Sequence, residues 1–342
     1  MDSLTQAVLG GAVSYAILGQ RIGKRAALYG AVFGTLPDLD VLIDFGGPIE
    51  NMTYHRGFSH SVLVQSLVAP VLAWMITRPK QLTDSVFLKW WLAIFFCFVT
   101  HSLADLFTVY GTQILWPLSA HPFSYSLLFI IDPLYTLPLI IAFVSALVSR
   151  NTRRNLQINH LMLIVSTAYL CWSASAKLLI DEKALTALNF RGISPAVYES
   201  TPAPFNTLLW RSVAIAGDHY YEIWTSVFDE IDDVQIVGNP RNLELLEPVA
   251  NHPSVQRLQW FTKQQYKAWE SGDKIFLSDL RMGIEGSYVF NFEVAKREID
   301  GVVTGSFAQL EQRPQLSRMP EIWQRIFDPS VELSSYPDRT IK

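Results

Sequence analysis

Long apolar runs are confined to the first half of this 342-residue chain, and they constrain its fold more than any other feature. The clearest are KWWLAIFFCFVTHSLADLFTVYG at 89–111 and SLLFIIDPLYTLPLIIAFVSALVS at 126–149. A helix needs about 20 mostly apolar residues to cross the hydrocarbon core of a bilayer. The first half is therefore predicted to be a membrane domain, whereas residues 185–342 have the interspersed charges of a soluble domain.

The apolar runs predict a mainly α fold, a polytopic helical bundle of about six spans over residues 1–182. The predicted spans cover about 4–20, 26–45, 60–77, 88–110, 127–149 and 158–180. The first run is short and rich in small residues, so it is either a tightly packed span or a re-entrant segment. Its residues Gly10, Gly11 and Ala12 would allow another helix to approach closely.

Lysine and arginine collect in alternate connections between these spans. They are Arg21, Lys24 and Arg25, then Arg78, Lys80 and Lys89, then Arg150, Arg153 and Arg154. Loops 46–59 and 111–126 hold one basic residue between them, Arg56. Because basic connections stay in the cytoplasm, this pattern predicts that those two loops and the C-terminal domain are extracytoplasmic.

Residues 185–342 are predicted to form a soluble α+β domain. Alternating stretches such as LLWRSVAIAG at 208–217 and GSYVFNFEV at 286–294 indicate antiparallel strands, and 251–272 has a helical pattern. The proline-rich segment 191–206 is predicted to be a linker. A net charge of -4 without a basic patch argues against a nucleic-acid partner.

Ionisable side chains are costly inside a membrane, so those within the apolar half need an explanation. Seven of them recur near the predicted extracytoplasmic ends of the spans: Asp38, Asp40, His55, His60, His101, Asp105 and Asp132. His101 and Asp105 are four residues apart and share one helix face. The convergence of these side chains from four segments predicts a metal site.

Imidazole and carboxylate ligands suit zinc, with manganese or iron as alternatives. Such an ion activates water and stabilises charge on a phosphoryl or acyl oxygen. Asp105 or Asp40 is the candidate general base, and Arg56 the candidate clamp for an anionic substrate group. The hydroxyl groups of Ser59, Thr108 and Thr35 are expected to orient the ligands.

Each residue alone also has an ordinary structural explanation. A single buried histidine can be a hydrogen-bonded core residue. Asp38 and Asp40 could cap a helix after Pro37, and Asp132 could cap the helix that starts at Pro133. The metal site is favoured because His60, His101 and Asp105 are expected at similar depth.

Five segments in this order resemble the YdjM-like family of bacterial inner-membrane proteins, over roughly residues 1–150. They are MDSLTQAVLGGAV, GTLPDLDVLID, HRGFSHS, HSLADLFTVYGTQILWPLS and IDPLYTLP. That family is described as metal-dependent hydrolases and is distantly similar to the zinc-dependent phospholipase C and P1 nuclease group. The resemblance implies an inner-membrane location and a ligand role for His55, His60, His101, Asp105, Asp38 and Asp40.

One position departs from the family's pattern. Many relatives have a Thr-His pair near the start, where this chain has Thr5-Gln6. Either one metal ligand is missing here or Asp2 takes its place.

The sequence thus predicts a membrane-bound metal-dependent hydrolase acting on a phosphoester, a lipid among the candidates, at the extracytoplasmic surface. The alternative is a non-catalytic scaffold for the outer domain, or a metal or proton carrier. An intramembrane zinc protease is disfavoured because the chain contains no H-E-x-x-H motif.

Overall fold

The protein is described here from a computed structural model that covers residues 1–149, 151–299, 301–310 and 316–333. It divides into two compact units. The helical unit comprises 1–43, 55–174 and 204–206, and the second unit comprises 44–54, 175–203 and 207–342. Arg150, one of the basic residues used to predict topology, lies outside the described residues.

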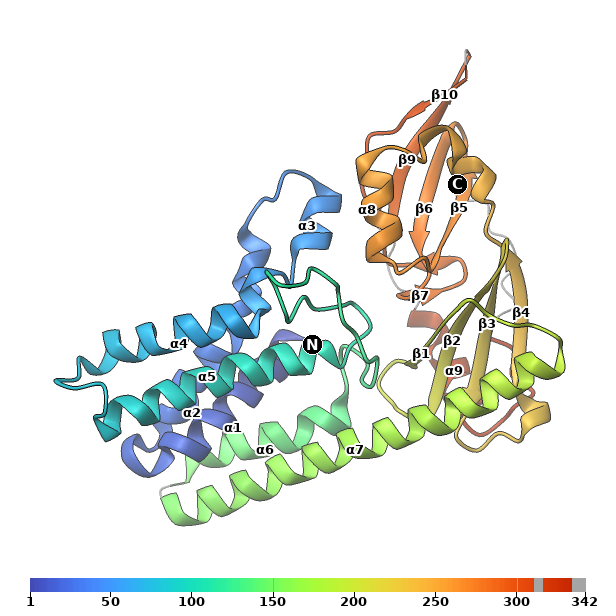
Figure 1. Ribbon diagram of the computed structural model, residues 1–342. Coiled ribbons are helices and arrows are strands. Elements are labelled where there is room, and N and C mark those ends of the chain that lie inside the picture. Colours follow the sequence, from blue (N-terminus) through green and yellow to red (C-terminus); the bar gives the residue numbers. More distant parts are fainter. Residues whose placement is uncertain (150, 300, 311–315, 334–342) are drawn as a thin grey trace. The chain divides into compact units, whose positions relative to one another are not determined.

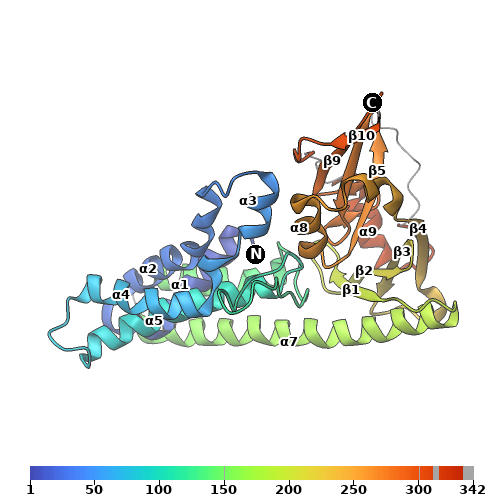
Figure 2. The same cartoon turned by 45° about the horizontal axis from the view of Figure 1, so that its top comes forward.

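Helices make up the first unit (Figure 1). They are α1 (Ser3–Ile22), α2 (Lys24–Thr35), α4 (Val62–Thr77), α5 (Ser85–Leu106), α6 (Pro133–Val148) and the first part of α7 (Thr152–Phe190). Two short 3₁₀ helices, η1 (Pro37–Leu42) and η2 (Phe58–His60), lie between α2 and α4 in the sequence. Helix α1 packs against α2, α5 and α6, and Figures 1 and 2 both show α1, α2 and α5 side by side.

The predicted close approach of α1 to other helices is confirmed. A Cβ atom added at Gly10 would lie 2.3 Å from the carbonyl oxygen of Gly30 and 2.7 Å from the Cα atom of Gly34. A Cβ atom at Gly30 would lie 2.2 Å from the carbonyl oxygen of Gly10. Only glycine fits where these two backbones meet. This contact fixes α2, and the η1 segment that follows it, against α1.

The number of membrane spans differs from the prediction of six. Two helices in the described part of the chain, α5 and α7, are long and apolar enough to cross a membrane. A third candidate is the pair Pro48–His60 and Val62–Thr77, which is bent by 56°. Helices α2 and α6 have 12 and 16 residues, which is about 18 and 24 Å, short of a bilayer core of about 30 Å. Helix α1 has the length, but its glycines and polar residues lower its hydropathy.

The second predicted span ends earlier than expected because of a proline in the local sequence. It was expected to continue to residue 45, but α2 ends at Thr35. Pro37 has no backbone N–H group and cannot continue an α-helix, so the chain turns into η1. The break places Asp38 and Asp40 on a short segment that is independent of the helix before it.

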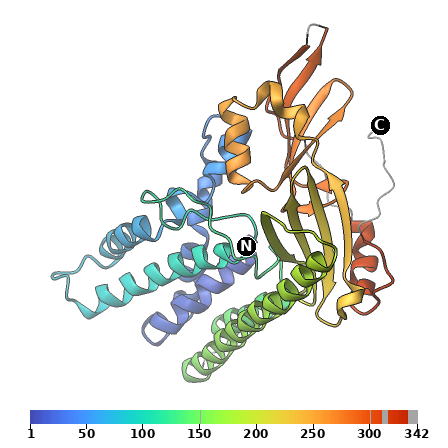
Figure 3. The same ribbon diagram turned by 45° about the vertical axis from the view of Figure 1, so that its right-hand side comes forward.

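Two four-stranded antiparallel sheets and helices form the second unit, as predicted for an α+β domain (Figure 3). The first sheet has the order β1 (Val197–Pro202), β2 (Leu209–Ala216), β3 (His219–Ser226) and β4 (Gln235–Pro240). The second has the order β10 (Gly301–Thr304), β9 (Asn291–Glu298), β6 (Lys274–Asp279) and β5 (Tyr266–Ser271). The remaining elements are α3 (Pro48–Tyr54), α8 (Pro253–Phe261), α9 (Met319–Arg325), η3 (Ile231–Asp233), η4 (Leu243–Val249), η5 (Leu316–Arg318), and the pair β7 (Gly283–Ile284) and β8 (Ser287–Tyr288).

Two predictions in this half were wrong. The helix expected over 251–272 ends at Phe261, and Tyr266–Ser271 forms β5 instead. The segment 191–206 is not only a linker, because Val197–Pro202 pairs with β2. In both cases pairing with a neighbouring strand, which a local pattern cannot show, decides the conformation.

Candidate metal centre

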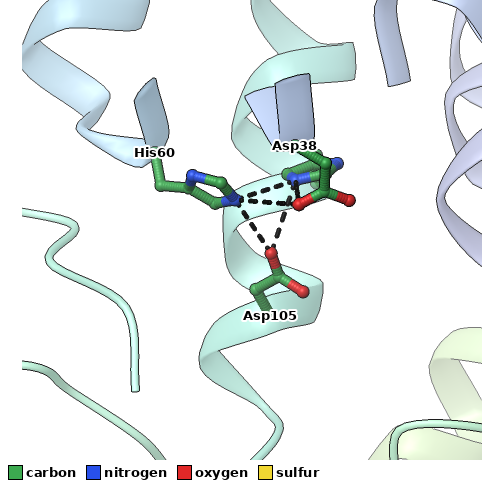
Figure 4. Close-up of side chains that lie close together, drawn as sticks. Asp38, His60 and Asp105 are labelled. Atoms are coloured by element: carbon green, nitrogen blue, oxygen red, sulfur yellow. Dashed lines mark hydrogen bonds and ion pairs between the residues drawn. The ribbon is translucent and has the colours of Figure 1, made fainter. Parts of the chain in front are cut away.

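Four side chains from three elements converge in the helical unit (Figure 4). They are Asp38 from η1, His60 from η2, and His101 and Asp105 from α5, and one ligand atom of each lies within 4.8 Å of the others. His101 and Asp105 share one face of α5, as their spacing of four residues predicted. The structure therefore brings together four of the seven predicted ligands.

Distances between the ligand atoms fit a small divalent ion. The Nε2 atom of His60 lies 3.0 Å from His101 Nε2, 3.0 Å from Asp105 Oδ2 and 3.5 Å from Asp38 Oδ1. His101 Nε2 lies 3.3 Å from Asp105 Oδ2 and 3.5 Å from Asp38 Oδ1. A tetrahedron with metal–ligand bonds of 2.0–2.1 Å has edges of roughly 3.3 Å. Five of the six edges are close to that value, and the sixth, between Asp38 and Asp105, is no longer than 4.8 Å.

The side chains differ in their access to solvent. Those of His60, His101 and Asp105 have no exposed surface, whereas the side chain of Asp38 is 23% exposed. Asp38 therefore marks the direction from which water or a ligand can reach the cluster.

The second nitrogen of each histidine has a partner. The Nδ1 atom of His101 lies 2.6 Å from the carbonyl oxygen of Gly34, and Nδ1 of His60 lies 2.9 Å from Ser59 Oγ. Ser59 in turn donates a hydrogen bond of 2.6 Å to Asp40. Metal-binding histidines commonly donate their second N–H group in this way, which fixes the tautomer and the ring orientation. The arrangement leaves both Nε2 atoms free to face an ion.

Asp40 and His55 form a separate pair beside the four ligands. The Oδ1 atom of Asp40 lies 2.7 Å from His55 Nδ1, and its Oδ2 accepts hydrogen bonds from Ser59 and from the backbone N–H group of Arg56. The ring of His55 is 6.0 Å from that of His60, centroid to centroid. The geometry of this pair is that of a carboxylate orienting an imidazole.

Both aspartates near the cluster have lowered pKa values. Burial raises the pKa of Asp38, but hydrogen bonds with His101 and His60 outweigh it and hold the pKa well below the usual range. Burial likewise raises the pKa of Asp40, and the hydrogen bond and charge of His55 lower it by more. Both carboxyl groups are therefore ionised at neutral pH, which is the form that binds metal.

Arg56 is buried beside Asp105 rather than extended toward solvent. Its Nη2 atom lies 3.2 Å from Asp105 Oδ1, and its Nη1 donates a hydrogen bond of 3.1 Å to Thr108 Oγ1. Its backbone has a φ of 61°, a left-handed conformation that is uncommon for a residue with a side chain. Ser59 contacts His60 and Asp40, whereas Thr108 accepts from Arg56 and donates to the backbone carbonyl oxygen of Asp105. The hydroxyl group of Thr35 donates to carbonyl oxygens of its own helix instead.

Gln6 is a site residue that the sequence did not identify. Its Nε2 atom donates to Asp105 Oδ1 at 3.1 Å and to the carbonyl oxygen of His101 at 3.3 Å. The one indication in the sequence was that Gln6 stands where many relatives of the family have the histidine of a Thr-His pair. Asp2, the suggested substitute, caps α1 by accepting hydrogen bonds from the backbone N–H groups of Leu4 and Thr5.

Asp132 lies outside the cluster of four. Its carboxylate accepts hydrogen bonds from the backbone N–H groups of Leu134 and Tyr135 and caps α6. Its other oxygen accepts a hydrogen bond of 3.0 Å from the hydroxyl group of Tyr169. The capping role considered from the sequence is the one the structure shows.

The fold and the cluster define a membrane protein with a buried two-histidine, two-aspartate site of metal-binding geometry. The chain belongs to the YdjM inner membrane protein family, whose family model matches residues 1–180. Residues 181–342 lie outside that match. The family resemblance and an inner-membrane location are thereby confirmed.

One curated relative is an uncharacterized protein of Bacillus subtilis (strain 168), YfhP, which is 31% identical over 143 residues. The alignment covers 39% of this chain and 42% of the relative, so the chain matches less than half of that protein's length. No solved structure matches the chain. The distant similarity to the phospholipase C and P1 nuclease group therefore stays a prediction from the motifs.

Proposed function

We propose that this protein is a membrane-bound, metal-dependent hydrolase that cleaves phosphoesters at the extracytoplasmic surface of the inner membrane. The observation that supports the proposal best is the set of four donor atoms at coordination distances, three of them on fully buried side chains. Buried histidine and aspartate side chains are costly in a membrane protein, and they commonly mark functional sites. Zinc fits its two imidazoles and two carboxylates, and manganese or iron is the alternative.

A divalent ion held by Asp38, His60, His101 and Asp105 would polarise a phosphoryl oxygen and activate water. Arg56 would contribute positive charge beside Asp105, with its orientation fixed by Thr108. Two buried atoms at this position, Arg56 Nε and Gln6 Oε1, have no hydrogen-bond partner. Arg56 Nε is a donor that can bind a substrate oxygen, whereas Gln6 Oε1 is an acceptor that can bind only a hydrogen, such as one of a water molecule.

The proton acceptor in this proposal is the Asp40–His55 pair rather than Asp105. The carboxylate of Asp105 already contacts four side chains, those of His60, His101, Arg56 and Gln6. The side chain of His55 is 22% exposed and is oriented by the ionised carboxylate of Asp40. An imidazole held in this way is a common general base.

Hydrolysis of a soluble phosphodiester tests the proposed function. The metal-loaded protein in detergent should cleave bis(p-nitrophenyl) phosphate, and Asp38→Asn should lower the rate about 100-fold. His160→Ala, which changes an exposed histidine of α7, is the matched control and should keep the parent rate. A metal-loaded parent without activity on any phosphoester tested would contradict the proposal.

A structural metal site in a non-catalytic scaffold is the second candidate. The observation in its favour is that four protein ligands would complete the coordination of a tetrahedral zinc ion, as in structural sites. The catalytic and the structural site differ in the expected role of Asp38 and in the expected effect of removing the metal. In a catalytic site its exposed carboxylate can yield a position to substrate, whereas in a structural site chelation of the metal should unfold the helical unit.

A further inference from the structure

The candidate metal centre is bordered by six exposed apolar side chains, which we call the apolar rim. They are Leu39, Val41 and Leu42 of η1, and Leu115, Trp116 and Leu118 of the loop after α5. Leu42 is 79% exposed and Leu118 80% exposed. Exposed apolar groups that gather around a site mark a surface that something apolar covers.

Within η1, site residues and rim residues alternate. Asp38 and Asp40 face the metal cluster and its supporting pair, whereas Leu39, Val41 and Leu42 are exposed. Leu28 and Val32 of α2, the helix before η1, are also exposed. The rim residues of η1 are therefore sequence neighbours of Asp38, the most accessible of the four ligands.

The loop is joined to the same site through its backbone. Gln113 donates its N–H group to the carbonyl oxygen of Arg56 at 2.9 Å, and Ile114 accepts a hydrogen bond of 3.1 Å from Val62. The hydroxyl group of Ser61 donates to the carbonyl oxygen of Trp116, whose ring is 6.4 Å from that of Phe58. The loop residues of the rim are thus held beside the segment that carries His60.

Two physical arguments indicate where the loop after α5 lies relative to the membrane. The stretch 106–131 contains no Asp, Glu, Lys or Arg, and several exposed leucine and tryptophan side chains close together are unusual on a surface that faces water. The segment 107–132 contains no helix, and irregular backbone exposed to lipid is not found in the hydrocarbon core. The remaining environment is the membrane interface, which tryptophan also prefers.

We propose that the apolar rim inserts into the interfacial region of the bilayer and that the substrate is a membrane phospholipid. Its phosphoester would lie at the cluster, and its acyl chains would lie against the rim. The substrate class rests on the proposed function, whereas the depth of the rim does not. The rim places the buried donor atoms at the level of lipid headgroups, where the phosphoesters of a bilayer are found.

The first experiment measures activity in vesicles of phosphatidylethanolamine and phosphatidylglycerol, by the appearance of a phosphomonoester signal in ³¹P NMR, which cleavage of either phosphoester bond produces. Leu42→Ser/Leu118→Ser should lower lipid cleavage roughly tenfold, because the acyl chains lose their apolar contact. The rate at which the same variant hydrolyses bis(p-nitrophenyl) phosphate should stay within about twofold of the parent rate. The control Leu67→Ser/Leu161→Ser removes two exposed leucines of α4 and α7 and should change neither rate.

The second experiment measures how deeply the apolar rim lies in the bilayer, and it does not depend on enzymatic activity. A fluorophore attached to Leu118→Cys, in a Cys171→Ser background that leaves only the buried Cys97, should be quenched by lipids spin-labelled near the headgroup. Quenching by aqueous iodide alone would overturn the inference, and so would protection from both quenchers, which would indicate a protein partner.

The outcomes separate the two proposals. Cleavage of the soluble ester without cleavage of lipid, or lipid cleavage unaffected by the rim variant, overturns the lipid inference and leaves the hydrolase. Cleavage of neither substrate by metal-loaded protein overturns the hydrolase and the substrate class with it.

Discussion

Asp38 and Asp40 are two residues apart, yet their side chains have different surroundings. Asp38 reaches the two Nε2 atoms of His60 and His101, whereas Asp40 is bound to His55 and Ser59. The sequence predicted both as ligands because an aspartate pair after a helix break gives no means of telling them apart. The difference depends on which histidine each one meets.

His55→Gln tests whether His55 is a ligand or a general base. If the pair with Asp40 supplies the base, the variant should retain its metal and lose about 100-fold or more in the rate of hydrolysis. Metal content is measured beside the rate, with His101→Ala as the variant that should lose both. Loss of metal from His55→Gln would instead assign it to the ligands.

The site could be predicted from the sequence to the extent that its residues were unusual in an apolar segment. His60, His101 and Asp105 stood out for that reason. Gln6 did not, because glutamine is not a typical metal ligand, and only the departure from the family's Thr-His pair pointed to its position. Its contact with Asp105 bridges 99 positions in the chain and required the packing of α1 on α5.

At the scale of elements, all six predicted helices are present, although their limits and their lengths relative to a bilayer differ from the prediction. Apolar runs fix the positions of helices, but glycines and prolines decide where each one ends and how closely it packs. In the second unit the stretch predicted as a strand at 208–217 forms β2, although its residues are buried on both faces instead of alternating. The pairing of Tyr266–Ser271 with β6 had no local signature.

Gly30→Ala should destabilise the helical unit by about 1–3 kcal/mol. The new Cβ atom would lie 2.2 Å from a backbone oxygen of α1 and 2.5 Å from the side chain of Ser14, so the helices must separate. Unfolding in detergent by denaturant measures the change. Gly19→Ala is the control, because its nearest neighbours are atoms of the Tyr15 side chain at 3.1 Å. Equal stability of the two variants would show that the contact between α1 and α2 is not tight.

At the scale of the whole molecule, the distribution of Lys and Arg predicts that the chain ends outside the cytoplasm. Alkaline phosphatase fused after residue 342 should therefore be active in cells, and a green fluorescent protein fused there should be dark. The opposite pair of results would reverse the orientation and place the candidate metal centre at the cytoplasmic surface.

Four side chains, three of them fully buried, are proposed to hold a metal ion, and elemental analysis of the detergent-purified protein tests this proposal. The parent and the His160→Ala control should contain about one zinc, manganese or iron ion per chain. His60→Ala/His101→Ala should contain none while its circular dichroism stays that of the parent. Equal metal content in all three proteins, or no metal in any of them after reloading, would contradict the claim.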